Sequence, residues 1–235
     1  ANYAIAAIGS ETSGSILSPS GKNSLVGLKP TIGAISRSGI VPISSSMDTA
    51  GPMTKNVIDN AILMSALVGE DPNDTYSFES LPIRFDYLDT ISFKGFRLGL
   101  NRNFEEDSLM KIAVGKIKSE GAEIILFTPP KINLDQFRTL LDVDMRSDLP
   151  KYFTSFAHSK LGLDSLKDVV DFNAKDSLLH APYGQGIFQR ISKENRYQAD
   201  FESTKKLIML TAQSYFQDVI EKYNLDAFLS IDNYS

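Results

Sequence analysis

The stretch that decides the fold reads Gly9-Ser10-Glu11-Thr12-Ser13-Gly14-Ser15-Ile16-Leu17-Ser18-Pro19-Ser20, and it directly follows a short apolar run. A serine hydroxyl becomes a good nucleophile only when a base takes its proton, and acyl transfer also needs donors for the oxyanion that forms. Small residues at positions 13 and 14 let successive backbone N–H groups point into one concavity. We therefore take Ser15 as the candidate nucleophile. A Ser/Gly-rich linker is the alternative for this stretch alone.

Three further motifs follow: Val26-Gly27-Leu28-Lys29-Pro30-Thr31, Ser36-Arg37-Ser38-Gly39 and Asp48-Thr49-Ala50-Gly51-Pro52-Met53. From Gly9 to about Val68 the chain resembles the amidase signature family, whose motifs read approximately G-[ST]-[DE]-T-x-G-S-I, V-G-L-K-P-T, S-R-x-G and D-x-x-G-P-M. The order and the spacing both match. Within the family, the chain looks most like the peptide-amidase branch because of Glu11, Leu17 and the run Ile43-Ser44-Ser45-Ser46.

The resemblance implies an α/β fold with a mixed β-sheet flanked by helices, and amide hydrolysis by a Ser-Ser-Lys arrangement. The nucleophile would be Ser15, and the oxyanion would be held by the backbone N–H groups of Thr12, Ser13 and Gly14, together with that of Ser15. No metal or organic cofactor is implied. In the family the bridging serine and the lysine base precede this loop, but residues 1–8 contain neither serine nor lysine. We therefore expect an incomplete fold, truncated at both ends, that lacks both groups.

Other residues near these motifs have expected supporting roles. The resemblance implies that Arg37 and Asp48 support the loop by hydrogen bonds, and a surface ion pair is the alternative. Ser10 and Ser13 could be nucleophiles on spacing alone, but Ser13 stands where relatives usually carry Gly, Asn or Asp. We interpret Ser13 as a residue that shapes the pocket.

A substitute base within the chain would have to be a lysine or a histidine. The nearest lysines in sequence are Lys22, Lys29 and Lys55, of which Lys29 belongs to the G-L-K-P turn. A triad of Ser15 with Asp48 and one of the two histidines is the other possibility. Neither His158 nor His180 has a recognisable triad context, and we expect both on solvated helices.

We interpret residues 1–235 as a single amidase-type α/β domain, with a signature region over 1–69. Residues 70–235 would hold a strand–helix–strand unit, a helical insertion on the substrate side and a terminal core strand. Hydrophobic spacing and capping residues predict the following elements: a buried strand over 3–8, a helix from Val57 to Val68 with Thr54 as N-cap, an exposed connection over 70–90, strands at 96–100 and 123–127 around a helix at about 105–120, helices over most of 134–223, and a strand over 225–231. In the last helix, an apolar face is formed by Ile208, Ala212, Tyr215 and Val219.

Between the predicted helices, residues 178–188 resemble the Gly-Gln-containing stretch of peptide-amidase relatives. In those relatives the stretch lies towards the substrate entrance. Tyr183 and Gln185 are therefore candidates for lining the substrate pocket. An ordinary loop between helices is the alternative.

The composition limits the classes of function. With 42% hydrophobic and 23% charged residues, the chain of 235 residues can bury a sizeable core. A formal net charge of -5 gives no basic field for nucleic acid or an anionic membrane. The absence of cysteine excludes disulfides, thiolate zinc sites and a cysteine nucleophile. No apolar run reaches the roughly 20 residues of a membrane-spanning helix. We expect a cytoplasmic location by default, although a missing N-terminal segment could carry an export signal.

The resemblance implies that the full enzyme cleaves the C–N bond of a small amide or peptide amide through an acyl-Ser15 intermediate. The runner-up is the glutamine-hydrolysing subunit of a tRNA-dependent amidotransferase, a relative with the same signature; Leu17 and residues 178–188 argue against it. In a third interpretation, the chain is a catalytically silent structural or interaction fragment. Core strands at both ends also predict exposed apolar surface and self-association through the sheet.

Overall fold

The computed structural model describes residues 3–80, 92–131, 136–193 and 201–231. In the signature region, three strands form an antiparallel sheet of order β1-β3-β2, with β1 at Ala6–Glu11, β2 at Val26–Gly27 and β3 at Thr49–Thr54. The pairing places Glu11 opposite Thr49. The central strand β3 is almost wholly buried, so it fixes the end of β1 from which the Ser15 stretch departs.

The prediction of a buried strand over residues 3–8 is wrong. The strand lies three residues further on, and much of it is open: Ile8 is 57% exposed, and Ile5, just before the strand, is 83% exposed. The reason is that β1 is an edge strand with β3 on one side only. The Gly9–Ser20 stretch accordingly contains the end of β1, a turn and the start of an unpredicted helix, α1 (Leu17–Lys22). Pro19 is tolerated there because the first turn of a helix needs no N–H donor.

Helix α2 (Val57–Leu67) confirms the helix predicted after Gly51-Pro52, but its N-cap is Asn56 and not Thr54. The Asn56 side chain accepts a hydrogen bond from the Asp59 N–H, whereas the Thr54 hydroxyl donates to the Asn56 carbonyl. Asn60 is buried and donates to two backbone carbonyls of the sheet, those of Val26 and Pro52. Polar contacts therefore help to hold α2 on the sheet.

The predicted exposed connection over 70–90 is only partly described, because residues 81–91, which include Leu81-Pro82, lie outside the described residues. Most residues of its described part are exposed, as predicted, and the exception is Asp74. Asp74 is 8% exposed and binds Arg37 with both carboxylate oxygens. The turn around Asp74 is therefore attached to the signature region.

A second sheet has the order β5-β4-β6, with β4 at Arg97–Asn101, β5 at Glu123–Phe127 and β6 at Ala227–Leu229, all parallel. Helix α3 (Ser108–Ser119) connects β4 to β5, after the short 3-10 helix η2 (Arg102–Phe104). The parallel pair and its helix confirm the predicted strand–helix–strand arrangement. The α/β class with helices flanking the sheets is also confirmed, with antiparallel and parallel pairing divided between two sheets.

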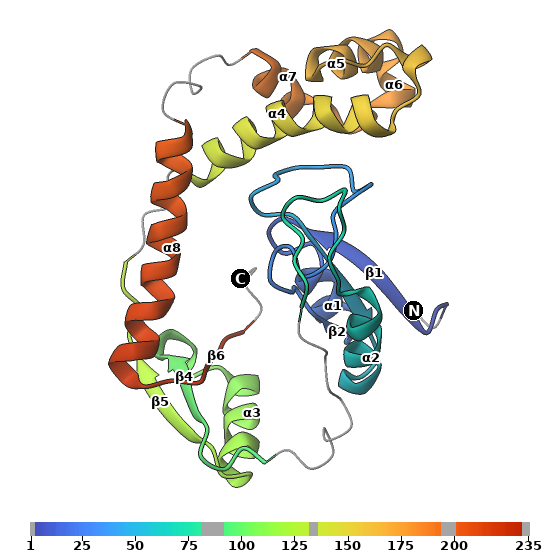
Figure 1. Cartoon of the computed structure of the whole chain (residues 1–235). Helices are drawn as coiled ribbons and strands as arrows, with labels where there is room; N and C mark the ends of the chain where they lie inside the picture. The colour runs from blue at the N-terminus through green and yellow to red at the C-terminus, as the bar shows by residue number, and fades with distance from the viewer. Residues whose placement is uncertain (1–2, 81–91, 132–135, 194–200, 232–235) are drawn as a thin grey trace.

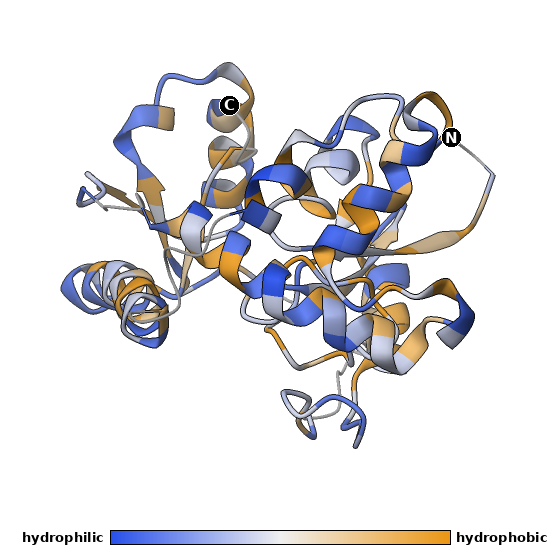
Figure 2. Cartoon of the chain, turned by 90° about the horizontal axis from the view of Figure 1, so that it is seen from above, coloured by the Kyte–Doolittle hydropathy of each residue, from blue (hydrophilic) through white to orange (hydrophobic). Residues whose placement is uncertain are grey.

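Most of the remaining described chain is helical: α4 (Phe137–Phe156), η3 (Ser159–Leu161), α5 (Leu166–Lys175), α6 (Ser177–His180), α7 (Gly186–Lys193) and α8 (Phe201–Tyr223). Figure 1 shows α4 to α7 as one group beside the signature region, and α8 running from that group to the parallel sheet. Figure 2 looks almost along the axis of α8. Val219 of its predicted apolar face is buried with Phe127 and Leu225. None of the helices in the described ranges is long and apolar enough to cross a membrane.

Candidate active site

Ser15 lies in the turn that joins β1 to α1, and its side chain is exposed. Gly14 makes this turn possible, since its φ of 102° lies in a region that side chains disfavour. The next residue, Ile16, is 0% exposed and anchors the turn in the core. The turn therefore presents the Ser15 hydroxyl on a backbone that is fixed immediately behind it.

Glu11 holds this turn from the inside. Its carboxylate is buried and accepts hydrogen bonds from the Ile16 N–H at 2.8 Å and the Leu17 N–H at 3.0 Å. Burial acts to raise the pKa of Glu11, but hydrogen bonds from the Leu17, Ile16 and Gly14 N–H groups and the charge of Lys29 together lower it. Glu11 is therefore a carboxylate that orders the start of α1. The Gly14 N–H, which the sequence predicts to hold the oxyanion, is one of the hydrogen-bond donors that lower the pKa of Glu11 in this structure.

Lys29 completes the inner side of the turn. Its Nζ donates to the Thr12 carbonyl at 2.7 Å and lies 3.7 Å from a Glu11 oxygen. These contacts explain the lysine of the G-L-K-P motif as a structural cation beneath the turn. Lys22 and Lys55, the other lysines near in sequence, are exposed.

Asp48 joins the turn to the neighbouring loop. Its Oδ1 accepts the Thr12 hydroxyl at 2.5 Å, and its Oδ2 accepts the N–H groups of Ile43 and Ser44, each at 2.8 Å. The carboxylate is buried, and its hydrogen bonds link the loop over residues 43–48, which we call the serine loop, to the residue that follows β1. These partners are a threonine and two backbone groups, not a histidine.

Arg37 supports the serine loop and not the Ser15 turn directly. It donates to the Ser45 carbonyl and forms a two-pronged pair with Asp74, at 2.9 Å from Nε and 2.8 Å from Nη2. Hydrogen bonding to Arg37 lowers the pKa of Asp74 to about 2, against the opposing effect of burial. The guanidinium also lies over the ring of Tyr76, 4.5 Å from its centroid. The pair is largely buried, so the alternative of a surface ion pair is wrong.

The two histidines lie in the helical group. His158 caps η3, its Nδ1 accepting from the Lys160 N–H, and His180 stacks on Phe172 at 4.4 Å between ring centroids. Both have local structural roles, because these contacts lie within the helical group and away from Ser15 and Asp48. In the described part of the chain, no group of three or more acidic or histidine side chains could hold a metal ion.

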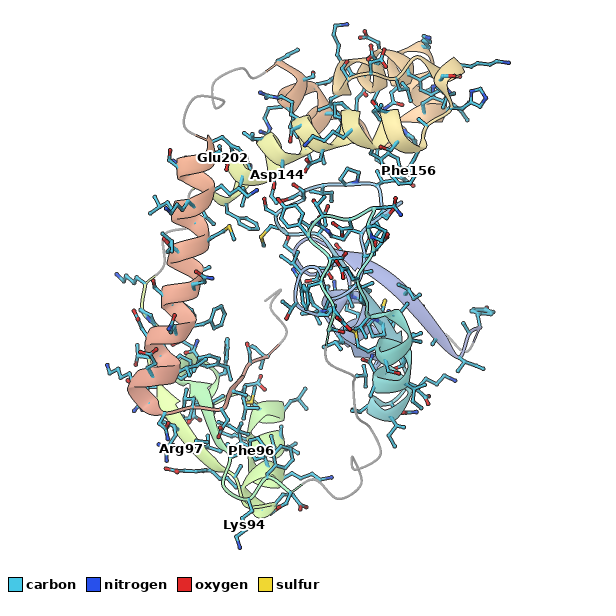
Figure 3. The ribbon with its side chains drawn as sticks, viewed as in Figure 1. Lys94, Phe96, Arg97, Asp144, Phe156 and Glu202 are labelled. Carbon is cyan, nitrogen blue, oxygen red and sulfur yellow. The ribbon has the colours of Figure 1, made fainter. Side chains whose placement is uncertain are left out.

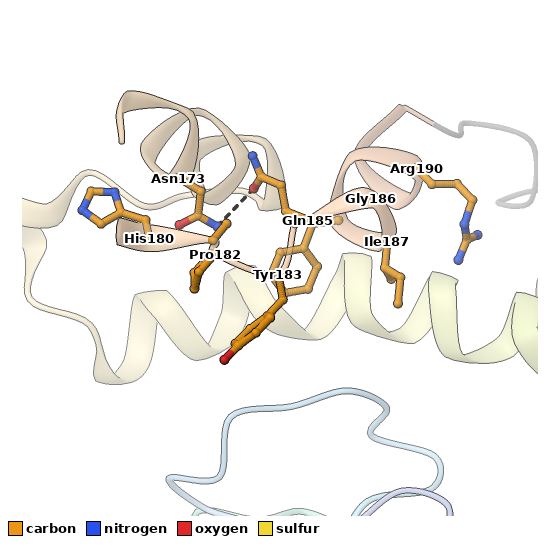
Figure 4. A pocket seen from close by; sticks show the side chains of 11 residues that line it. Asn173, His180, Pro182, Tyr183, Gln185, Gly186, Ile187 and Arg190 are labelled. Atoms are coloured by element: carbon orange, nitrogen blue, oxygen red, sulfur yellow. Dashed lines mark hydrogen bonds between the residues drawn. The ribbon is translucent and has the colours of Figure 1, made fainter. Parts of the chain in front are cut away.

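A cavity of about 690 Å³ opens between α5, α6 and α7, and Tyr183 and Gln185 both line it. Gln185, the residue before α7, accepts from the Asn173 side chain and donates to the Val170 carbonyl, each at 3.1 Å, so it joins the start of α7 to α5. Tyr183 is fully exposed and extends away from the Asn173–Gln185 pair (Figure 4). The described lining comes from residues 173–190, so the structure does not bring these two residues to the Ser15 turn.

Sequence reasoning missed two acidic residues of α4, Asp144 and Asp148. Both are buried and bind the serine loop, Asp144 through the Ser44 hydroxyl and Asp148 through the Ser45 N–H at 2.8 Å. Their spacing of four residues on a helix was a signal that they share one side, but the same spacing is typical of a solvated face.

The model of the Amidase family matches residues 1–232. A putative amidase of Arthroderma benhamiae is 34% identical over 211 residues, which is 86% of this chain and 31% of that protein. The glutamyl-tRNA(Gln) amidotransferase of Brachyspira hyodysenteriae has a subunit that is 33% identical over 164 residues, 65% of this chain and 34% of that protein.

Among solved structures, native peptide amidase from Stenotrophomonas maltophilia is 31% identical and superposes with a TM-score of 0.85. The superposition covers 97% of this chain and 49% of the peptide amidase. The chain thus spans about half of that structure and about a third of the two curated relatives. By its motifs, by the family match over nearly its whole length and by its fold, the chain belongs to the amidase signature family, on the side of the peptide amidases.

Proposed function

We propose that the chain carries the nucleophile of a serine amidase, and that Ser15 attacks the carbonyl carbon of a small amide or peptide amide. The observation that carries this proposal is the exposed Ser15 hydroxyl on a turn fixed by Glu11 and the buried Ile16. Such a turn holds a nucleophile in place before substrate arrives, which lowers the entropic part of the barrier.

The reaction has two steps. The Ser15 oxygen forms a bond to the carbonyl carbon while its proton passes to a base, and the C–N bond then breaks as the nitrogen leaves with a proton, as ammonia or an amine. Water next attacks the acyl ester, releasing a carboxylate and restoring the serine. The backbone N–H groups of Thr12, Ser13 and Gly14 are the proposed donors to the oxyanion. The Gly14 N–H would then stop donating to the Glu11 carboxylate and donate to the oxyanion instead.

A base completes this mechanism, and we propose the family's lysine and bridging serine for that role. Lys29 is a poor substitute because its Nζ already donates a hydrogen bond to the Thr12 carbonyl and pairs with the Glu11 carboxylate. A base must accept a proton, whereas both contacts use Lys29 as a donor.

Hydrolysis of aminoacyl-p-nitroanilides and of peptide amides by residues 1–235 tests this function, together with covalent labelling of Ser15 by a fluorophosphonate. We expect labelling at Ser15, located by mass spectrometry, and its loss in Ser15→Ala. Ser18→Ala, which changes another serine of the same stretch, is the matched control. Labelling without turnover would support the third interpretation, a correctly built but catalytically silent fragment. Absence of labelling at Ser15 in a chain that also contains the lysine and the bridging serine would contradict the proposal, because only there is the Ser15 hydroxyl activated.

The amidotransferase subunit stays the second candidate because a protein of that name is 33% identical to this chain. Leu17 and residues 178–188 still argue against it. Glutamine hydrolysis, measured with and without amidotransferase partner subunits, separates the two. Turnover of glutamine that depends on those subunits would favour the second candidate.

We also propose self-association through the open edge of β1. Ile5 and Ile8 are exposed, beside and on a strand that, among the described residues, pairs with another strand along one side only. Such edges pair with other chains. Size-exclusion chromatography with light scattering should show a mass that rises with concentration, and Ile8→Lys should reduce it. A single monomeric mass at high concentration would contradict this.

A further inference from the structure

Helix α4 presents two buried carboxylates to the serine loop. Asp144, 2% exposed, accepts the Ser44 hydroxyl and the Ser46 N–H, the latter at 3.3 Å. Asp148, 8% exposed, accepts the Ser45 N–H at 2.8 Å. Because the two residues are four apart, they lie on one side of the helix. Figure 3 labels Asp144 on α4 beside the signature region.

The serine loop is bound at the same time to the Ser15 turn. Asp48 accepts the Ser44 N–H with one oxygen and the Thr12 hydroxyl with the other. A continuous series of hydrogen bonds therefore runs from Asp144 through Ser44 and Asp48 to Thr12. Three of its four members are less than 7% exposed and the fourth, Thr12, is 7% exposed.

Burial makes this series stiff. A carboxylate without water must keep its hydrogen-bond donors, because an unpaired buried charge is strongly unfavourable. If α4 moved relative to the signature region, Asp144 would lose donors that water could not replace at once. The position of the serine loop is therefore tied to that of α4.

Helix α4 is also the support of the helices that line the 690 Å³ cavity. Arg190 of α7 pairs with Asp142 of α4, and Leu149 of α4 packs with Leu166 and Ile191. The helix thus contacts the cavity walls on one side and the serine loop on the other.

We propose that Asp144 and Asp148 are positioning residues for Ser15, acting through the serine loop and the contact between Asp48 and Thr12. This inference rests on the proposed function of Ser15. It implies that a substrate group bound in the cavity between α5, α6 and α7 contacts helices that pack on α4, the same helix that positions the Ser15 turn.

Hydrogen–deuterium exchange of residues 1–235 tests the series without any need for turnover. Asp144→Ala should raise exchange about tenfold or more both in residues 41–50 and at the amides of Ile16, Leu17 and Ser18. Asp144→Asn keeps an acceptor oxygen for Ser44 and Ser46, so exchange should return to within about threefold of the parent. Ser44→Ala, which removes only the hydroxyl donor, is a milder variant if Asp144→Ala does not fold.

Asp142→Ala is the matched control, because Asp142 is a buried aspartate of the same helix whose partner is on α7. It should change exchange in residues 186–193 and leave residues 16–18 unchanged. In a Thr12→Val background, Asp144→Ala should still affect residues 41–50 but no longer residues 16–18. Three results would overturn the proposal. Asp142→Ala could raise exchange at residues 16–18 as much as Asp144→Ala does, or Asp144→Ala could leave exchange at residues 16–18 unchanged. The third is that Asp144→Ala still raises exchange at residues 16–18 in the Thr12→Val background.

A catalytic readout separates this inference from the proposed function. Where Ser15-dependent turnover is measured, Asp144→Ala should lower kcat about tenfold or more and change KM by less than about threefold, since substrate contacts are kept. If Ser15→Ala left turnover and labelling unchanged, the proposed function would fail although the exchange result could stand. If Ser15 were confirmed but exchange behaved as in the control, only the positioning role would fail.

Discussion

Thr12 and Asp48 are 36 residues apart in sequence, yet the Thr12 hydroxyl donates to the Asp48 carboxylate at 2.5 Å with both residues buried. This contact joins the end of β1 to the residue that precedes β3. It adds a side-chain bond to the pairing of Glu11 with Thr49. The backbone just before the Ser15 turn is thereby held at two neighbouring residues, Glu11 and Thr12, and we expect the side-chain bond to contribute measurably to stability.

Thr12→Val should lower the free energy of unfolding by about 1–2 kcal/mol, because the side chain keeps its shape and loses one hydrogen bond to a charged group. Asp48→Ala should cost more, about 3 kcal/mol, because it also leaves the Ile43 and Ser44 N–H groups without their acceptor. Urea unfolding measures both. Thr31→Val, at an exposed threonine, should stay within about 0.5 kcal/mol of the parent; equal costs at positions 12 and 31 would contradict the assignment.

Acid should weaken the chain through Asp74. Its pKa of about 2 in the folded state lies below the ordinary value of 3.8, so its stabilisation is present above about pH 4 and is lost as the pH falls towards 2. The shift corresponds to about 2 kcal/mol. Unfolding free energies from pH 6 to pH 2 should fall less steeply for Asp74→Asn than for the parent. Parallel curves for the two proteins would show that the pair with Arg37 does not carry this dependence.

Gly33 and Gly39 form a matched pair of positions with φ of 88° and 81°. An added Cβ at Gly33 would lie 2.1 Å from the Tyr76 carbonyl oxygen, whereas one at Gly39 meets nothing within 4 Å. Gly39→Ala should therefore cost only the backbone strain, about 1 kcal/mol, and Gly33→Ala several kcal/mol. Thermal or urea unfolding of the two variants compares them directly. A similar cost at both would mean that the turn around Tyr76 moves freely.

Gln185 and Tyr183 should separate stability from substrate binding in the cavity. Gln185→Ala removes bonds to Asn173 and to the Val170 carbonyl and should lower stability by about 1–2 kcal/mol. Tyr183→Ala should leave stability within about 0.5 kcal/mol, since the side chain is fully exposed. If the cavity takes substrate, Tyr183→Ala should raise KM in the amide assay. An unchanged KM would favour the alternative of an ordinary loop.

Contiguous patterns predicted much of this fold. The parallel strands β4 and β5 and the helix between them follow from short apolar runs and from Gly121, whose φ of 102° ends α3. The expectation that Asp48 bonds to the Ser15 stretch came from the family motif and not from local pattern. The N-cap of α2 was harder to predict, because Thr and Asn are both good N-cap residues. Thr54 is the last residue of β3, so Asn56 is left to cap the helix.

Contacts between distant segments could not be predicted from local patterns. Ser44 and Asp144 are 100 residues apart, and an aspartate within a helix normally indicates a face in water. Their burial arises only because α4 crosses the serine loop. The exposure of β1 could not be predicted either, since a run of small apolar residues is compatible with an edge strand as well as with a central one.

The position of β6 has a consequence for the order of folding. This strand pairs with β4, and the Arg97 N–H reaches Asp226 across 129 residues of sequence. Closing a loop of that length costs about 4 kcal/mol in chain entropy, whereas β4 and β5 are separated by one helix only. During synthesis the Ser15 turn emerges first, α4 with Asp144 much later, and β6 last of the described elements. The parallel sheet therefore stays open at one edge until residues 227–229 are made, and slow refolding is expected from this late pairing.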